Sequence, residues 1–223
     1  MRNISFIMKA GVATIAALTL GISSAAAETP PPAEQVYVVG VDGSLTPLGA
    51  SGTPEAAALL AHRLDGPMTA EEMEQLVAAL PEGGQSLTIV AVPQTATRSQ
   101  ARAAAAVAGK CESSTQGVWA RKSSGYGAVG TKPKTACTNP ARSHKIETSL
   151  LKRTAFGFKQ QGSTFTGGNT GEKNYQNTHI ELRCTNSKST DWQAANVHTT
   201  IDYAGCKIIL LSRSGVSSAE CGT

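Results

Sequence analysis

The five cysteines of this chain of 223 residues all lie in its second half, and none precedes residue 111. In an exported protein, cysteines pair into disulfides that compensate for a small hydrophobic core. Their distribution therefore predicts a disulfide-linked domain that begins near residue 110. The five are Cys111, Cys137, Cys184, Cys206 and Cys221.

An odd number of cysteines leaves one thiol over. We expect Cys111 to pair with Cys137 and Cys184 with Cys221, because Cys206 opens the apolar run CKIILL, where a free thiol packs as a small hydrophobic group. The alternative pairing joins Cys184 to Cys206. The remaining thiol could also form a disulfide with another chain.

The N-terminus has the features of an export signal. Arg2 and Lys9 precede a mostly apolar run over residues 10–22, and Ala25 and Ala27 supply the small side chains that a signal peptidase needs. We expect cleavage after Ala27, without a lipid anchor, and no later stretch is apolar enough for a transmembrane segment. The sequence thus predicts a secreted, extracellular bacterial protein.

Charge divides the mature chain into two parts. Residues 28–97 carry nine acidic side chains and one basic one, whereas residues 98–223 carry seventeen basic and seven acidic ones. Such asymmetry indicates either contact between the two parts or an anionic partner for the basic part.

The acidic part predicts a proline-rich spacer over residues 28–34 and a small α+β unit over 35–93. Asp42-Gly43 favours a β-hairpin, residues 53–64 and 69–80 favour helices, and residues 86–93 favour a strand, which gives the order ββααβ. Thr69 and Glu72 form a capping box at the second helix. We interpret the unit as a pro-segment or as an intramolecular partner of the basic domain.

Residues 94–109 are rich in alanine and could form a helix that ends at Gly109, but an exposed alanine helix has little to pack against, so we interpret them as a connector. The remaining residues, 110–223, predict an all-β sandwich or small barrel linked by disulfides. We expect strands near 117–122, 144–152, 154–159, 175–184, 193–203 and 205–212, with glycine-rich and polar segments such as 160–174 between them.

Motifs for cofactors and metals are weak. Residues 125–130, GYGAVG, match a dinucleotide fingerprint, but Pro133 opposes the helix that must follow it. His144 and Glu147 would point to opposite faces of a strand, and no third ligand stands at metal-binding spacing. No Gly-x-Ser-x-Gly motif is present. We therefore expect neither a cofactor nor a metal.

The segment THIELRC, residues 178–184, is the strongest candidate for catalysis. On a strand, His179, Glu181 and Arg183 would share one face, and His198 on a neighbouring strand could join them. A base, an acid and a cation are the groups that phosphodiester cleavage needs. The same alternation is also typical of the solvated face of an antiparallel strand, and this second interpretation is favoured.

Basic side chains flank the glycine-rich loop and predict a surface for anions. Tyr126 could stack on a ligand there, although such residues can also serve only to keep an exported domain soluble. The candidate anion-binding residues are Arg121, Lys122, Tyr126, Lys132 and Lys134.

Three stretches, VWARKSSGYGAVGTKPKTACTNP after Cys111, YQNTHIELRC and SSAEC, resemble small exported actinobacterial proteins that share a two-disulfide β domain. The resemblance covers residues 110–223 and implies export and a β fold, but no activity. Cys206 departs from the two-pair pattern.

These observations predict an exported protein whose basic β domain is a binding or antagonistic module for an anionic surface or polymer. One alternative is a small secreted nuclease of ribonuclease type, and another is a structural surface protein. We favour a binding module over an enzyme.

Overall fold

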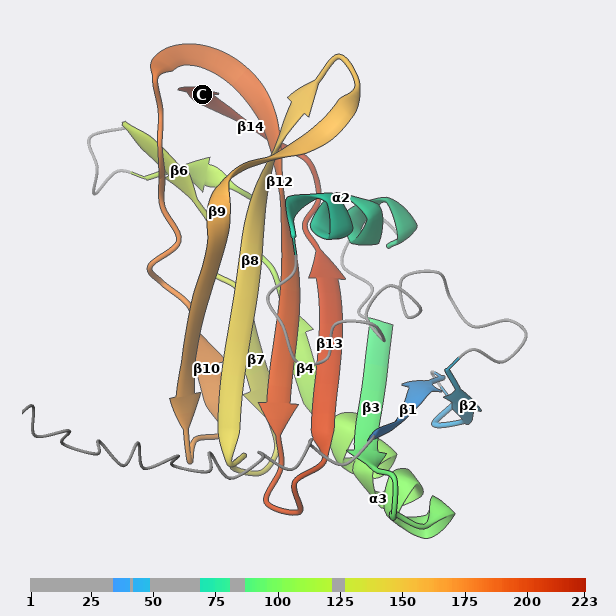
Figure 1. The fold of residues 1–223 in the computed structure, drawn as a ribbon. Coiled ribbons are helices and arrows are strands. Elements are labelled where there is room, and N and C mark those ends of the chain that lie inside the picture. The colour runs from blue at the N-terminus through green and yellow to red at the C-terminus, as the bar shows by residue number, and fades with distance from the viewer. Residues whose placement is uncertain (1–33, 41, 49–68, 81–86, 122–126) are drawn as a thin grey trace, which may run out of the picture. The chain divides into compact units, whose positions relative to one another are not determined.

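The structure, a computed structural model, describes residues 34–40, 42–48, 69–80, 87–121 and 127–223. An antiparallel eight-stranded sheet, sheet A, dominates this part of the chain (Figure 1). Its strands are, in spatial order, β2 (Leu45–Pro47), β1 (Glu34–Val39), β3 (Leu87–Pro93), β13 (Lys207–Arg213), β12 (Asn186–Ile201), β8 (Ser143–Thr154) and β9 (Gly157–Thr170), and β14 (Ser217–Gly222) pairs with β12.

Two three-stranded sheets accompany sheet A. Sheet B has the order β10 (Asn174–Gln176), β7 (Lys134–Cys137) and β4 (Cys111–Ser114). Sheet C has the order β11 (Leu182–Arg183), β6 (Ala128–Gly130) and β5 (Trp119–Ala120). The predicted all-β, disulfide-linked fold is therefore confirmed, and its layers are sandwich-like.

Alternate residues of the central strands of sheet A enter different cores. On one face, Val197 of β12 and Leu211 of β13 are register partners and pack with Met73 of helix α2 (Ala70–Ala79). Figure 1 shows α2 in front of β12 and β13. The period of two along each strand thus places one apolar set beneath this helix.

The opposite face of sheet A carries sheets B and C. Ile180 and Val129 of the sheet C region pack with Leu150 and Trp192 of sheet A, and all four side chains are fully buried. Packing two sheets face to face in this way buries the apolar side of each.

The alanine-rich segment forms the helix ended by Gly109 that its sequence allows, α3 (Arg98–Ala108), but this helix is packed rather than an exposed connector. Its small side chains Ala101, Ala104 and Ala108 are buried against Val92 and Ile208 of sheet A. Alanine permits a close approach of helix to sheet, so a composition that suggests a solvated linker here forms a tight contact. A capping box of Thr97 and Gln100 starts the helix.

A separate N-terminal unit is not what the structure shows. Strand β3 pairs with β13, and β1 pairs with β3, so the N-terminal strands extend the same sheet as the C-terminal ones. The hairpin of β1 and β2 and the helix over 70–79 do form, and Gly43 takes the left-handed conformation (φ 76°) that its turn needs. The expected helix over residues 53–64 lies outside the described residues.

The predicted polar loop over residues 160–174 is largely strand β9. Its glycines allow close contact: a Cβ atom on Gly168 would lie 2.3 Å from the carbonyl oxygen of His144 on the paired strand. Sequence reasoning reads glycine as a breaker, yet here its lack of a side chain permits the pairing. Four strands, β4, β6, β7 and β14, were not predicted.

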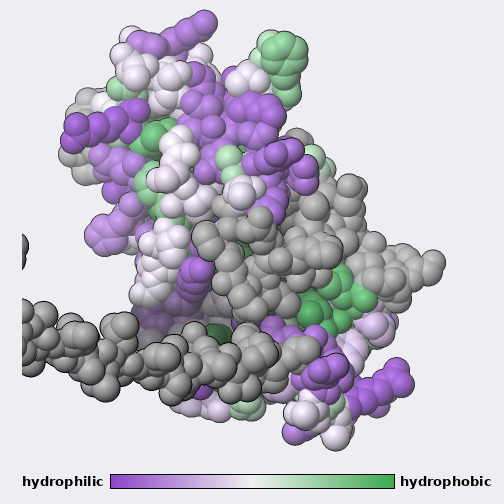
Figure 2. All heavy atoms as spheres, viewed as in Figure 1, coloured by the Kyte–Doolittle hydropathy of each residue, from purple (hydrophilic) through white to green (hydrophobic). Residues whose placement is uncertain are grey.

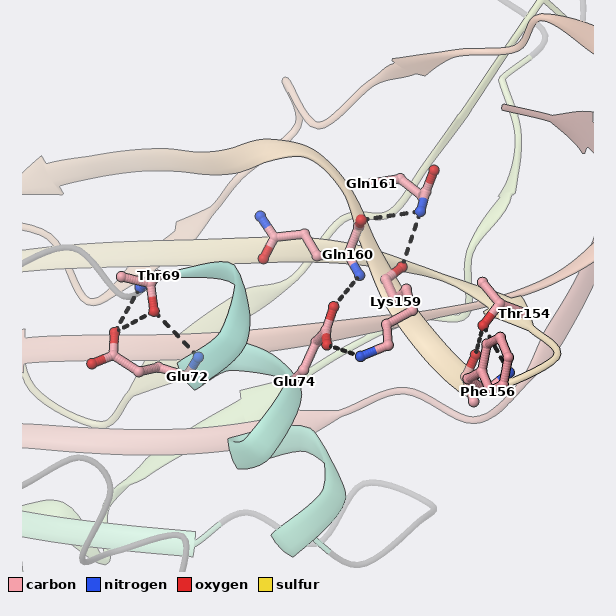
Figure 3. A network of polar contacts seen from close by, with 9 residues as sticks. Thr69, Glu72, Glu74, Thr154, Phe156, Lys159, Gln160 and Gln161 are labelled. Carbon is pink, nitrogen blue, oxygen red and sulfur yellow. Dashed lines mark hydrogen bonds and ion pairs between the residues drawn. The ribbon is translucent and has the colours of Figure 1, made fainter.

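Helix α2 also contacts the outer strand β9 through one carboxylate (Figure 3). Oε2 of Glu74 forms an ion pair with Nζ of Lys159, and Oε1 accepts the backbone N–H of Gln160 at 3.1 Å. The predicted capping box of Thr69 and Glu72 is present at the start of this helix. Glu74, from the acidic N-terminal part of the chain, thus accepts a backbone hydrogen bond from the outer strand β9.

Two disulfides link the C-terminal half. Cys111 pairs with Cys137 between β4 and β7, and Cys184 pairs with Cys221 near β11 and β14. These are the pairs that we favoured over Cys184 with Cys206. The thiol of Cys206 is free and buried.

Candidate functional site

His198, a candidate catalytic residue, lies in the core and has no exposed surface. Its Nδ1 atom lies 2.8 Å from Oγ1 of Thr135 in sheet B, and its Nε2 atom lies 3.2 Å from Oγ of Ser212 on β13. Desolvation lowers the pKa of His198 from 6.5 to about 3. The imidazole is therefore neutral and fully hydrogen-bonded between two sheets.

The hydroxyl of Ser212 extends this contact into a buried polar network. It lies 2.7 Å from Oγ1 of Thr115, which accepts a hydrogen bond from the amide of Asn196, and Oδ1 of Asn196 accepts one from Thr148. Ser212, Asn196 and Thr148 are each at most 1 % exposed. A serine beside a histidine would suit a nucleophile, but this pair has no access for a substrate, and its hydrogen bonds specify how the sheets pack.

Sequence reasoning missed this network because it considered only His198 of this strand, as a partner of His179, Glu181 and Arg183. Asn196, His198 and Thr200 do alternate, but they face sheet B rather than water. The alternation itself was the available signal. The alternation does not reveal that a second layer, sheet B, covers this face of β12.

The other catalytic candidates lie elsewhere. Residues 177–181 form an irregular segment between β10 and β11, so His179 and Glu181 are not on a strand as predicted. His179 is exposed, Glu181 is half-buried, and Arg183 is exposed on β11. A buried His198 cannot act beside an exposed His179, so the four predicted residues do not assemble into one site.

Side-chain hydrogen bonds to its backbone hold the irregular segment in place. The Arg121 guanidinium donates to the carbonyl oxygens of Thr178 and Ile180, and Oδ1 of Asn177 accepts the backbone N–H of His179. Gly130 makes room for this path, since a Cβ atom there would lie 2.2 Å from the carbonyl oxygen of Ile180. Arg121, an anion-binding candidate, therefore has a structural role in these contacts.

The remaining anion-binding candidates are divided. Lys122 and Tyr126 lie outside the described residues. Lys132 lies in the segment between β6 of sheet C and β7 of sheet B, and Lys134 begins β7, whereas Arg121 directly follows β5 of sheet C. Lys134 and Arg121 thus belong to different sheets, and the predicted five-residue surface stays a prediction.

A different set of cations lies on sheet B and on the segments next to the Cys111–Cys137 disulfide. The backbone N–H groups of Cys137 and Thr138 donate to the carbonyl oxygens of Lys173 and Lys110, which places these lysines on opposite sides of the end of β7. Lys134 begins the same strand, and the carbonyl oxygen of Arg142 accepts from Gly171, two residues before Lys173. We call Lys110, Lys134, Arg142 and Lys173 the sheet B cations.

All four sheet B cations are exposed. Within the part of the chain that the structure describes, none of them forms an ion pair with a carboxylate. Glu112 and Glu172 are the exposed acids of the same strands and loop, so cations outnumber acids there. Sequence reasoning found only Lys134, because the other three come from distant segments.

Four other bases of the C-terminal half form ion pairs with carboxylates, unlike the sheet B cations. Two of these pairs join the halves of the chain, Lys159 to Glu74 and Lys207 to Glu34. Two others lie within the second half, namely Lys145 to Glu147 at 2.9 Å and Arg153 to Asp191 at 3.1 Å.

Cys206 lines a largely apolar hollow of about 280 Å³ between α3 and the turn that joins β12 to β13. Burial raises the pKa of its thiol, and the charge of Asp202 raises it further. A thiol with a raised pKa is a poor nucleophile, so this cysteine acts as a small apolar side chain.

His144 and Glu147, the rejected metal candidates, are both buried, and His144 bonds Oγ1 of Thr200 and the carbonyl oxygen of Glu172. Burial lowers the pKa of His144, and the Glu172 carbonyl partly opposes that shift. Among the described residues there is no cluster of three or more potential metal ligands. No helix in the described ranges is long and apolar enough to cross a membrane.

Comparisons of the chain with protein families, with curated proteins and with solved structures found no match. The resemblance of residues 110–223 to exported actinobacterial proteins stays a prediction.

Proposed function

We propose that this protein is an exported binding module that holds an anionic polymer or surface at the sheet B cations. One observation carries the proposal: four exposed cations lie on sheet B and the segments joined to it, without carboxylate partners among the described residues. Unpaired cations held by a rigid scaffold attract polyanions, because their charge is not already neutralised.

In this proposal the acidic N-terminal segment is an intramolecular partner of the basic half. It pairs strand β3 with β13 and places Glu34 and Glu74 against Lys207 and Lys159. These contacts occupy bases that lie away from sheet B. The anionic ligand would then meet the sheet B cations without competition from Glu34 and Glu74.

Heparin, used as the polyanion probe, tests the proposal. The variant Lys134→Gln/Arg142→Gln/Lys173→Gln removes three sheet B cations. With fewer cationic contacts, fewer counterions are released when the protein binds heparin. We therefore expect the magnitude of the slope of log affinity against log salt concentration to decrease by about two units, and binding to be weaker at every salt concentration.

A matched control removes the same charge from paired bases. The variant Lys145→Gln/Lys159→Gln/Lys207→Gln loses three positive charges that already face carboxylates. We expect it to bind heparin nearly as the unaltered chain does. Equal losses in both variants would mean that net charge alone governs binding, and the proposed site would be wrong.

A further inference from the structure

The turn between β8 and β9 presents an aromatic side chain to solvent. Phe156 is 91 % exposed, the highest value among the large apolar side chains of the described residues. The turn is tight: Oγ1 of Thr154 donates to the carbonyl oxygen of Gly157 and accepts the backbone N–H of Phe156, and Gly157 has a φ of 100° (Figure 3). Phe156 is thus fixed at the tip of a rigid hairpin.

Phe158, two residues after Phe156 in the same hairpin, is partly buried rather than exposed. Phe158 packs against the core beneath α2, and the Arg153 guanidinium lies 5.0 Å from the centre of its ring. Arg153 is in turn paired with Asp191. The fold therefore covers one phenylalanine of this hairpin and leaves the other in water, where it costs free energy without a partner.

A polar hollow of about 470 Å³ lies beside the tip. Its lining includes the bases Lys152, Arg153 and Lys188 and a single acid, Asp191. Arg153 and the Ser218 hydroxyl already occupy the Asp191 carboxylate, and Nζ of Lys152 donates to the oxygen of Thr223.

Lys188 has no carboxylate partner within the described ranges. Trp192 is the register partner of Lys152, so Lys188 on β12 and Phe156 beyond β8 lie toward the same end of sheet A. Figure 2 shows this end as largely hydrophilic, with a green projection at the hairpin.

We propose that the β8–β9 hairpin docks on anionic lipid bilayers, with Phe156 inserted below the headgroups and Lys188 beside them. An aromatic ring suits the boundary between headgroups and acyl chains, and lysines close to the surface attract anionic lipids. A protein partner is less favoured, because a narrow tip with Ala155 and Gly157 beside the ring offers little area for a protein interface.

This second site is independent of the sheet B cations. The exposed carboxylate of Glu220 on β14 lies near the same end, opposite Ser189 of β12, so this end is not uniformly cationic. Insertion of Phe156 is therefore the larger part of the affinity, and the headgroup charge is the smaller part.

Co-sedimentation of the exported chain with phosphatidylcholine vesicles that contain phosphatidylglycerol tests the proposal. We expect Phe156→Ser to weaken binding to these vesicles at least tenfold. Lys188→Gln should weaken it severalfold on these vesicles, but not on vesicles of phosphatidylcholine alone. The control Tyr203→Ser removes another exposed aromatic side chain, 70 % exposed, from the turn after β12 at the opposite end of that strand. It should bind as the unaltered chain does.

A second variant reports insertion directly. Phe156→Trp should keep vesicle binding and show blue-shifted fluorescence that brominated lipids quench. The proposal is overturned if the unaltered chain does not sediment with vesicles, which would favour a protein partner, or if Phe156→Ser and Tyr203→Ser bind equally. Phe156→Ser should still bind heparin, and the triple sheet B variant should still bind vesicles. These two measurements distinguish a failure of the hairpin site from a failure of the proposed function.

Discussion

Replacing His198 with glutamine should reduce the acid sensitivity of the fold. The pKa of His198 is about 3 in the folded chain, against 6.5 for an unburied histidine. Between these values the unfolded chain binds a proton that the folded chain does not, so stability falls as the pH falls below 6.5. One pKa unit corresponds to about 1.4 kcal/mol, so this histidine alone costs roughly 2 kcal/mol of stability by pH 5.

Urea unfolding of the unaltered chain and of His198→Gln at pH 7.5, 6 and 5 measures this effect. Glutamine can still bond the hydroxyls of Thr135 and Ser212, but it does not titrate. The variant will be less stable at pH 7.5, because its packing is poorer. The stability difference between the two proteins should then shrink by about 2 kcal/mol between pH 7.5 and 5.

The comparison isolates one group. His144 and the carboxylates titrate in both proteins, so their contributions cancel in the difference. His179→Gln provides a control, since it makes the same replacement at an exposed histidine. A stability difference that stays constant from pH 7.5 to 5 would refute the reasoning that His198 is buried in its neutral form.

Three further outcomes are expected. Cys206 should resist a thiol reagent in the folded chain and react as one thiol per chain after denaturation, because it is buried and its pKa is raised; rapid reaction under native conditions would contradict this. Glu74→Ala should lower the free energy of unfolding by about 1 kcal/mol, since Gln160 loses its acceptor and Lys159 its partner, whereas no change would show that water replaces both. Removal of residues 28–109 should leave a chain that binds a hydrophobic dye and unfolds without cooperativity, because β13 loses β3 and the cover of α3; a cooperatively folding remainder would instead support a pro-segment.

Local patterns determined much of the secondary structure. Thr69 and Glu72 predicted a helix start because a capping box satisfies backbone donors within one turn, and Asp42-Gly43 predicted a hairpin because its turn is equally local. The pairing of the cysteines was also favoured correctly, since the apolar run after Cys206 indicates a buried thiol.

Long-range packing decided the rest. The sequence by itself determined that the chain has a β-rich, disulfide-linked half and that alternate residues of β12 share a face. Only the tertiary structure decided that His198 faces a second polar sheet, that the alanines of α3 are buried, and that Lys110 and Lys173 lie on either side of the end of β7. The reason is physical: the period of a strand or a helix fixes which side chains point together, but the layer that covers them comes from residues far away in the chain.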